Sequence, residues 1–174
     1  MQRPCSVTGV ERFFDQDEVI VSKTTSQGII TYANRTFLNI SGFDADEVIG
    51  RPHNVIRHPG MPRCIFKLLW DNLRSGKEVF AYIVNRCKQG DHYCVFAHVT
   101  PSLDADRTLL GYHSNRRVPD RAVLEGTIIP LYRSLTEVEQ RAADPKAGLE
   151  HAHGQLMSML ADKGVTYDRF IFAV

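Results

Sequence analysis

Three strand-like segments joined by very short turns constrain this chain more than any other feature. They cover residues 78–87, 91–102 and 108–117, and each is rich in β-branched and aromatic side chains. The turn sequences between them are QGD at 89–91 and LDAD at 103–106. A crossover between parallel strands needs about a dozen residues or more, so connections this short predict three antiparallel strands.

Two shorter strand segments and a helical region precede these strands. Residues 19–24 and 28–33 predict strands, and the TSQG around their junction supplies turn chemistry. Residues 34–50 predict two short helical pieces that end at glycines, the first of them capped by Asn34. Residues 62–75 predict the clearest helix, because apolar side chains recur there at helical spacing.

This order of elements predicts an α+β domain with a five-stranded antiparallel sheet and short helices on one face. We expect the domain over residues 18–118, after an N-terminal arm at 1–17. A C-terminal helical extension would follow at 119–174, with helices near 120–141 and 145–162. Helices on one face of a single sheet leave a concavity between the layers, and small molecules bind in such concavities.

Composition narrows the class of protein. The 174 residues carry 21 Lys+Arg and 20 Asp+Glu, a net charge of +1, which argues against a nucleic-acid binder. The four cysteines include no CxxC pair, so a zinc ribbon is not expected. The first residues lack the apolar run of a signal peptide, and no segment is long and apolar enough to span a bilayer. We therefore expect a cytoplasmic protein that does not insert into membranes.

Four sequence blocks narrow the fold to one family. They read ITYANRTFLNISGFDADEVIGRPHNVIRHPGMP, FKLLWDNLRSGKE, NRCKQGDHYCVFAHVTP and GYHSNRR. In this order and spacing the chain resembles a PAS domain over residues 18–118, and within that family the sensory PAS domain of bacterial aerotaxis receptors. The resemblance implies the PAS fold, noncovalent binding of FAD and a redox-sensing role.

The resemblance also implies candidate cofactor-binding residues. Asn34 and Asn85 would meet the pyrimidine edge of a flavin, because an amide both donates and accepts hydrogen bonds. Arg57 would hold the diphosphate in a bidentate manner, and His58 would contact the adenine or phosphate region. The further candidates are His53, Asn54, Phe66, Trp70 and Tyr93. Each also has a structural interpretation, such as a helix cap for Asn34 and core packing for Trp70.

Three positions depart from the family pattern and keep a second interpretation open. Gly60 stands where the family has an acid, and Val79 and Cys94 stand where it has tryptophans. A lost aromatic neighbour for the flavin favours a cofactor-free PAS module used for dimerisation or interaction. No GxSxG, HExxH or P-loop motif is present, so we do not expect an enzyme.

Other PAS cofactors make different demands on the sequence. A haem needs an axial ligand, for which the candidates are His53, His58, His98 and His113. A light-driven thiol adduct needs a cysteine in the segment RPHNVIRHPG, which has none.

The leading hypothesis is a redox- or oxygen-linked sensor that binds FAD. The sequence after the PAS region carries no recognisable kinase or receiver motif, so we expect output through a signalling partner in trans or through a homodimer. The apolar tail FIFAV is too hydrophobic to be left in water, and we expect it to dock on the sheet or to pair between subunits.

Overall fold

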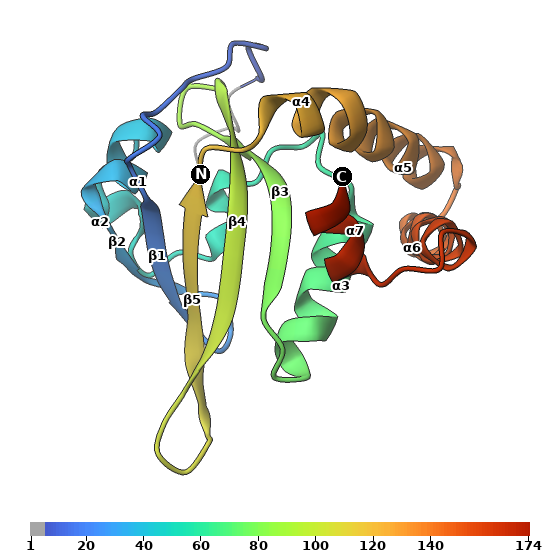
Figure 1. The fold of residues 1–174 in the computed structure, drawn as a ribbon. Helices are drawn as coiled ribbons and strands as arrows, with labels where there is room; N and C mark the ends of the chain where they lie inside the picture. The colour runs from blue at the N-terminus through green and yellow to red at the C-terminus, as the bar shows by residue number, and fades with distance from the viewer. Residues whose placement is uncertain (1–5) are drawn as a thin grey trace.

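Five antiparallel strands form the central sheet of the protein (Figure 1). The computed structural model describes residues 6–174, so Cys5 and the first part of the predicted N-terminal arm lie outside the described residues. The sheet order is β2-β1-β5-β4-β3. The strands are β1 (Ile20–Thr25), β2 (Ile30–Ala33), β3 (Val79–Arg86), β4 (His92–Leu103) and β5 (Leu109–Arg117). Every strand pair is antiparallel, which confirms the predicted fold class.

A helical crossover connects β2 to β3, which is the far edge of the sheet. It contains α1 (Arg35–Ser41), α2 (Ala45–Val48), the 3₁₀ turn η1 (His53–Ile56) and α3 (Arg63–Arg74). The Asn34 side chain accepts a hydrogen bond from the Phe37 N–H, which confirms its role as the cap of α1. Gly42 ends the same helix with a φ of 72°, in the left-handed region that glycine tolerates.

The segment between η1 and α3 runs beside β3 and extends the sheet by one bridge. Arg57 pairs with Asn85 there in antiparallel fashion. Successive residues of extended chain point to opposite faces, so Arg57 faces the crossover helices and His58 faces the other side. This alternation divides the conspicuous Arg-His pair between two different surfaces.

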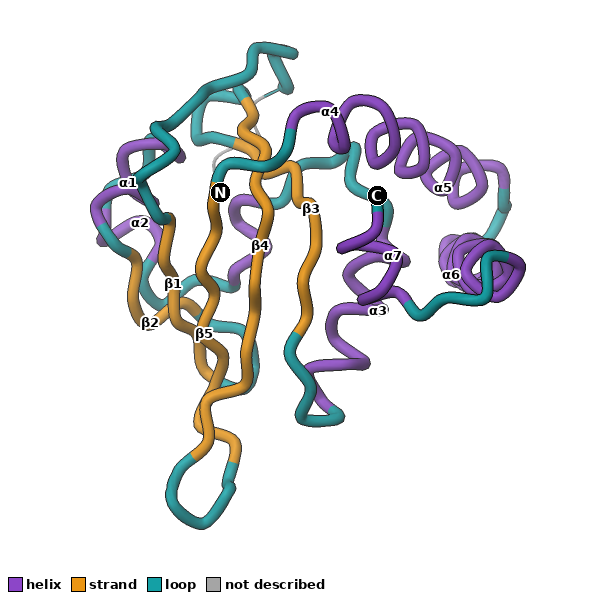
Figure 2. Tube along the Cα trace, in the orientation of Figure 1, coloured by secondary structure: helices purple, strands orange, loops and turns teal. Residues whose placement is uncertain are grey.

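The C-terminal extension is helical, as the sequence predicts. Its elements are α4 (Arg121–Val123), the π-helical turn η2 (Leu124–Ile128), α5 (Ile129–Arg141), α6 (Pro145–Asp162) and α7 (Tyr167–Ala173). Pro130 lies in the first turn of α5, where its missing N–H costs no hydrogen bond, so the helix restarts there. In Figure 2, α3, α5, α6 and α7 all lie beyond the β3 side of the sheet.

Side chains of the extension bind the PAS core directly. The Glu139 carboxylate on α5 accepts hydrogen bonds from the N–H groups of Arg63 (3.0 Å) and Cys64 (2.8 Å), so it caps α3. The Tyr132 hydroxyl donates to the Tyr82 carbonyl at 2.7 Å. Helix α5 therefore connects the helical layer to the sheet.

The apolar tail docks on the sheet of its own chain. Its residues form α7, in which Phe170 and Ile171 are buried. The Phe172 ring meets the Phe80 ring edge to face, with 4.8 Å between centroids. None of the helices within residues 6–174 is long and apolar enough to cross a bilayer.

Candidate functional site

A cavity of about 280 Å³ lies between the inner face of the sheet and the crossover helices. Its apolar wall is formed by α3 on one side and by β3, β4 and β5 on the other. The apolar lining residues include Phe66, Leu69, Trp70, Ile83, Val99 and Tyr112. The Trp70 and Tyr112 rings contact each other edge to face, with 5.3 Å between centroids, and form one continuous aromatic surface of the lining. A flat, conjugated ligand can pack against an aromatic surface of this kind.

Gly28 keeps the cavity open next to Trp70. It follows β1 in the turn before β2 and has a φ of 80°. A Cβ atom added there would lie 3.3 Å from the Trp70 ring. Any side chain at this position would therefore be strained and would press on the aromatic wall.

Three buried polar groups on residues that line this cavity have no hydrogen-bond partner within residues 6–174. They are the Asn85 Nδ2, the Ser114 Oγ and the Arg116 Nη1, and all three residues line the cavity. A buried donor without an acceptor costs about 1–3 kcal/mol. Three such groups on one cavity indicate that a polar ligand completes their hydrogen bonds.

Arg116 is the most unusual of these groups because it is a buried cation, 4% exposed. Its Nη2 donates to the Ser22 Oγ at 2.9 Å and to the His53 Nε2 at 2.7 Å. Within residues 6–174, the ion pairs include none that joins Arg116 to a carboxylate. Burial lowers the pKa of Arg116, and a buried charge with only neutral partners is costly. The site is therefore built to receive electron-rich or anionic atoms.

His53 shares this polar cluster and is held in its neutral form. Because arginine only donates, the Nε2 of His53 accepts, and its proton lies on Nδ1. Burial, and secondly the charge of Arg116, lower the pKa of His53 to about 3. The imidazole therefore supplies a polar, uncharged group at neutral pH.

Arg57 stands at another wall of the cavity. Its guanidinium lies over the Phe66 ring, 4.2 Å from the centroid. Burial lowers the pKa of Arg57, with partial compensation from the charge of Glu139. The stacking holds the guanidinium beside the cavity, where its N–H groups can meet a ligand.

Six of the nine sequence-predicted site residues line this cavity and three do not. Those that line it are His53, Asn54, Arg57, Phe66, Trp70 and Asn85. The Asn34 amide is used inside the protein, because it caps α1, accepts from the Val21 N–H and donates to the Val19 carbonyl. Tyr93 is fully buried and is not among the residues that line the cavity.

His58 faces away from this cavity, because it follows Arg57 in an extended segment, where successive side chains point to opposite sides. It lines a second cavity on the outer side of the sheet, and its ring lies 5.7 Å from that of His92. Its Nδ1 accepts the Gly60 N–H at 3.1 Å, so both residues belong to that outer surface.

Cys94 also points to the outer side of β4, and burial raises its pKa to about 12. Cys94, which stands where the resemblance places a tryptophan, is thus not on the wall of the inner cavity. Val79 is buried but is not among the residues that line the cavity.

Sequence reasoning missed Ser22, Ser114 and Arg116. The last two share the inner face of β5 with Tyr112, because residues two apart in a strand point the same way. The polar run SNRR resembles an exposed strand end and conceals this register. The period-two spacing from Tyr112 was the available signal.

The sheet order, the helical crossover on its inner face and the polar-edged cavity between them are those of the PAS fold. The PAS fold family model matches residues 30–115. Residues 30–115 of the chain therefore form a PAS domain.

The chain is also similar in sequence to two bacterial proteins of known name. The chain is 38% identical to the aerotaxis receptor of Escherichia coli (strain K12) over 120 residues, which is 68% of this chain and 23% of the receptor. It is 25% identical to the nitrogen fixation regulatory protein of Klebsiella pneumoniae over 59% of this chain and 21% of that protein. The chain thus spans less than a quarter of either relative. Its PAS domain is of the aerotaxis-receptor type.

Solved structures agree on the fold. The blue-light photoreceptor Aureochrome1 LOV in its light state gives a TM-score of 0.54 at 18% identity, over 71% of this chain and 93% of that one. A light-oxygen-voltage domain studied with a flavin analogue gives 0.56 at 17% identity, over 63% of this chain and 82% of that one.

Proposed function

We propose that this protein binds FAD in the inner cavity and senses redox state. The observation that carries the proposal is the set of three unpartnered polar groups on Asn85, Ser114 and Arg116, which face an aromatic-walled cavity. The pyrimidine edge of an isoalloxazine presents several acceptors to donors arranged in this way. The aerotaxis-receptor resemblance supports the same cofactor.

Each lining group has a separate task in this proposal. Trp70, Phe66 and Tyr112 would exclude water and hold the ring flat. Asn85 and Ser114 would orient its polar edge, and Arg116 would stabilise negative charge there. Arg57 would hold the diphosphate at the cavity wall. The bound flavin supplies a ring whose charge and protonation change on reduction.

The alternatives find less support. Of the four candidate haem ligands, His53 alone lines the inner cavity, and its Nε2 already accepts from Arg116. His98 interacts with Glu78 on the outer face, at 2.7 Å. A cofactor-free module would have no evident use for a buried, uncompensated arginine, because replacing such a charge by an apolar residue is often stabilising.

Signal output would pass through helices that touch both the cavity and the extension. Helix α3 carries Phe66 and Trp70 into the cavity wall, and Glu139 of α5 caps the first turn of α3. A shift of α3 on reduction of the flavin would therefore be transmitted to α5. We propose that α5 and its neighbouring helices pass this change to a protein partner in trans. Dimerisation of the chain remains a prediction for analytical ultracentrifugation.

The test compares two arginines that neighbour each other in sequence. Arg116→Met removes the buried donor, whereas Arg117→Met removes an exposed charge at the next position. After reconstitution with FAD and gel filtration, we expect the wild type and Arg117→Met to retain the flavin. Arg116→Met should bind it at least tenfold more weakly, because a hydrogen bond from a charged group is worth about 1.5–3 kcal/mol. Equal retention by both variants would show that Arg116 does not contact the cofactor.

A further inference from the structure

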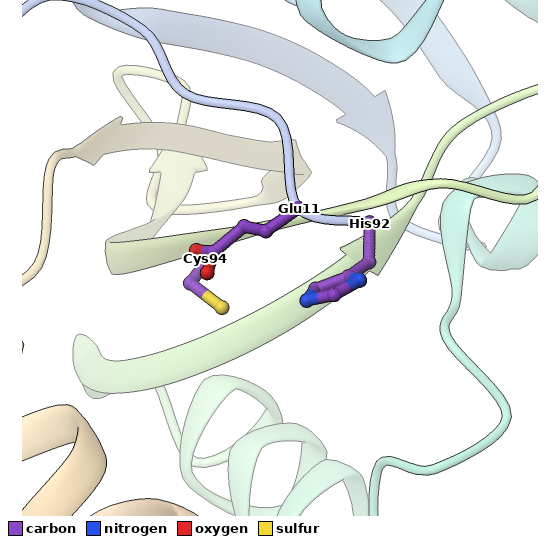
Figure 3. A group of neighbouring side chains, drawn as sticks. All are labelled: Glu11, His92 and Cys94. Atoms are coloured by element: carbon purple, nitrogen blue, oxygen red, sulfur yellow. The ribbon is translucent and has the colours of Figure 1, made fainter. Parts of the chain in front are cut away.

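A second group of chemically reactive side chains lies on the outer side of β4. Glu11 comes from the N-terminal arm, and His92 and Cys94 come from β4. One oxygen, nitrogen or sulfur atom from each lies within 4.8 Å of the others. Figure 3 shows His92 and Cys94 projecting from the same face of the strand, with the Glu11 carboxylate reaching toward Cys94.

Backbone pairing fixes these three residues relative to one another. The arm lies parallel to β4 at a bridge between Glu11 and His92. The Arg12 N–H donates to the His92 carbonyl at 2.7 Å, and the His92 N–H donates to the Val10 carbonyl at 2.9 Å. His92 and Cys94 share a face because they are two residues apart in a strand. The cluster therefore does not depend on flexible side chains meeting by chance.

We propose that Glu11, His92 and Cys94 bind a divalent ion of the zinc class. Sulfur, imidazole nitrogen and carboxylate oxygen are the three ligand types that zinc takes in proteins. A thiolate and a carboxylate together balance the charge of the ion. The sulfur also selects against magnesium and calcium, which prefer oxygen ligands. Binding would release the Cys94 thiol proton to solvent.

Arg121 supports the carboxylate and does not block it. Its Nη1 and Nη2 donate to the two oxygens of Glu11 at 2.6 and 2.9 Å. An ionised carboxylate has about four lone-pair sites, so one oxygen can bind a metal while both keep their arginine hydrogen bonds. Outer partners of this kind orient metal ligands. Arg121 also donates to Glu125 at 2.8 Å, which offsets part of its positive charge near the ion.

Two members of the cluster face the second cavity, of about 430 Å³, between β4 and α5. His92, Cys94 and Tyr132 are among the residues that line it. A three-ligand ion would find room there for a water molecule in its fourth position. Because this cavity is on the opposite side of the sheet from the proposed flavin site, the two sites are separate.

The resemblance to aerotaxis receptors does not imply this metal site. Cys94 stands where the resemblance places a tryptophan, which has no metal-ligating atom. The lack of a CxxC pair has no bearing on this site, because Glu11 and His92 are far apart in sequence and are brought together by the arm.

Cobalt(II) is the direct probe, because a cobalt–thiolate bond gives a charge-transfer band and tetrahedral cobalt gives visible d–d bands. The purified full chain, freed of flavin, is titrated with cobalt(II), and zinc affinity is measured by competition with a chromophoric chelator. We expect one equivalent to bind with a thiolate band. Cys94→Ser should abolish the band and weaken zinc binding by about tenfold or more, since even outer-shell changes cost 10–100-fold.

Cys87→Ser is the matched control, because Cys87 is also buried and its sulfur donates to the Ile40 carbonyl. This variant should keep the band and the affinity. Glu11→Gln and His92→Gln provide further variants if Cys94→Ser fails to fold, and each should weaken zinc binding similarly. The proposal is overturned if the wild type gives no thiolate band, if the band survives Cys94→Ser, or if all these variants bind zinc as the wild type does.

Discussion

Mild acid should destabilise the protein through one imidazole, that of His53. Its Nε2 accepts from Arg116 at 2.7 Å and lies 3.0 Å from the Ser22 hydroxyl, so protonation would place two cations together. Burial and that arginine lower its pKa from 6.5 to about 3. The unfolded chain therefore binds a proton at His53 that the folded protein does not, and stability falls as the pH falls below the unfolded pKa.

The expected size follows from these two pKa values. Each pH unit between them is worth about 1.4 kcal/mol, so His53 should remove about 2 kcal/mol of stability between about pH 7 and about pH 5. The result at pH 5 holds for any folded pKa below about 4, since His53 is then still neutral in the folded protein. Urea unfolding of the flavin-free protein at both pH values measures this loss.

His53→Gln is the control, because glutamine offers an oxygen to Arg116 and Ser22 but does not titrate. Its stability should fall by about 2 kcal/mol less than that of the wild type over the same interval. The two proteins share all other titrating groups. If their stabilities fall equally, the assignment of His53 as a neutral acceptor of Arg116 is wrong.

Three further predictions concern stability. Glu139→Ala should lower the free energy of unfolding, measured with urea, by about 3 kcal/mol, because it removes the two hydrogen bonds that the carboxylate accepts from the first turn of α3. Glu137→Ala removes only an exposed ion pair with Arg141 and should lower it by less than about 0.5 kcal/mol. Gly148→Ala should lower the Tm, because the new Cβ would lie 2.4 Å from the Glu139 carbonyl oxygen, whereas Gly154→Ala has open space and should raise it. Arg116→Met should leave the flavin-free protein as stable as the wild type or more so, since it removes a buried, uncompensated charge; a loss above about 2 kcal/mol would contradict this account.

The fold could be predicted because its signals are local. Short turns dictated the antiparallel strands, and Asn34 and Gly42 marked the ends of α1 before any tertiary contact was known. The C-terminal helix α7 was not predicted as a helix, since its apolar run FIFAV has no helical periodicity in sequence. Its packing beside Phe80 and Phe96 sets its conformation.

The site was harder to predict because it depends on which way strand residues face. His58 adjoins Arg57 in sequence but projects to the opposite side of the sheet. Arg116 is one of two adjacent arginines, and only the register of β5 decides which is buried. The Glu139 cap and the Glu11 cluster join segments distant in sequence, so neither could be found without the fold.

The most direct test of the central claim is equilibrium titration of the flavin-free protein with FAD, followed by flavin fluorescence and absorption. We expect one FAD per chain, which is retained through gel filtration and has a flavin spectrum perturbed by the aromatic wall. Asn85→Leu and Arg116→Met should weaken binding while Arg117→Met should not. A wild-type protein that takes up no FAD, with its spectrum unchanged from that of free flavin, would contradict the account.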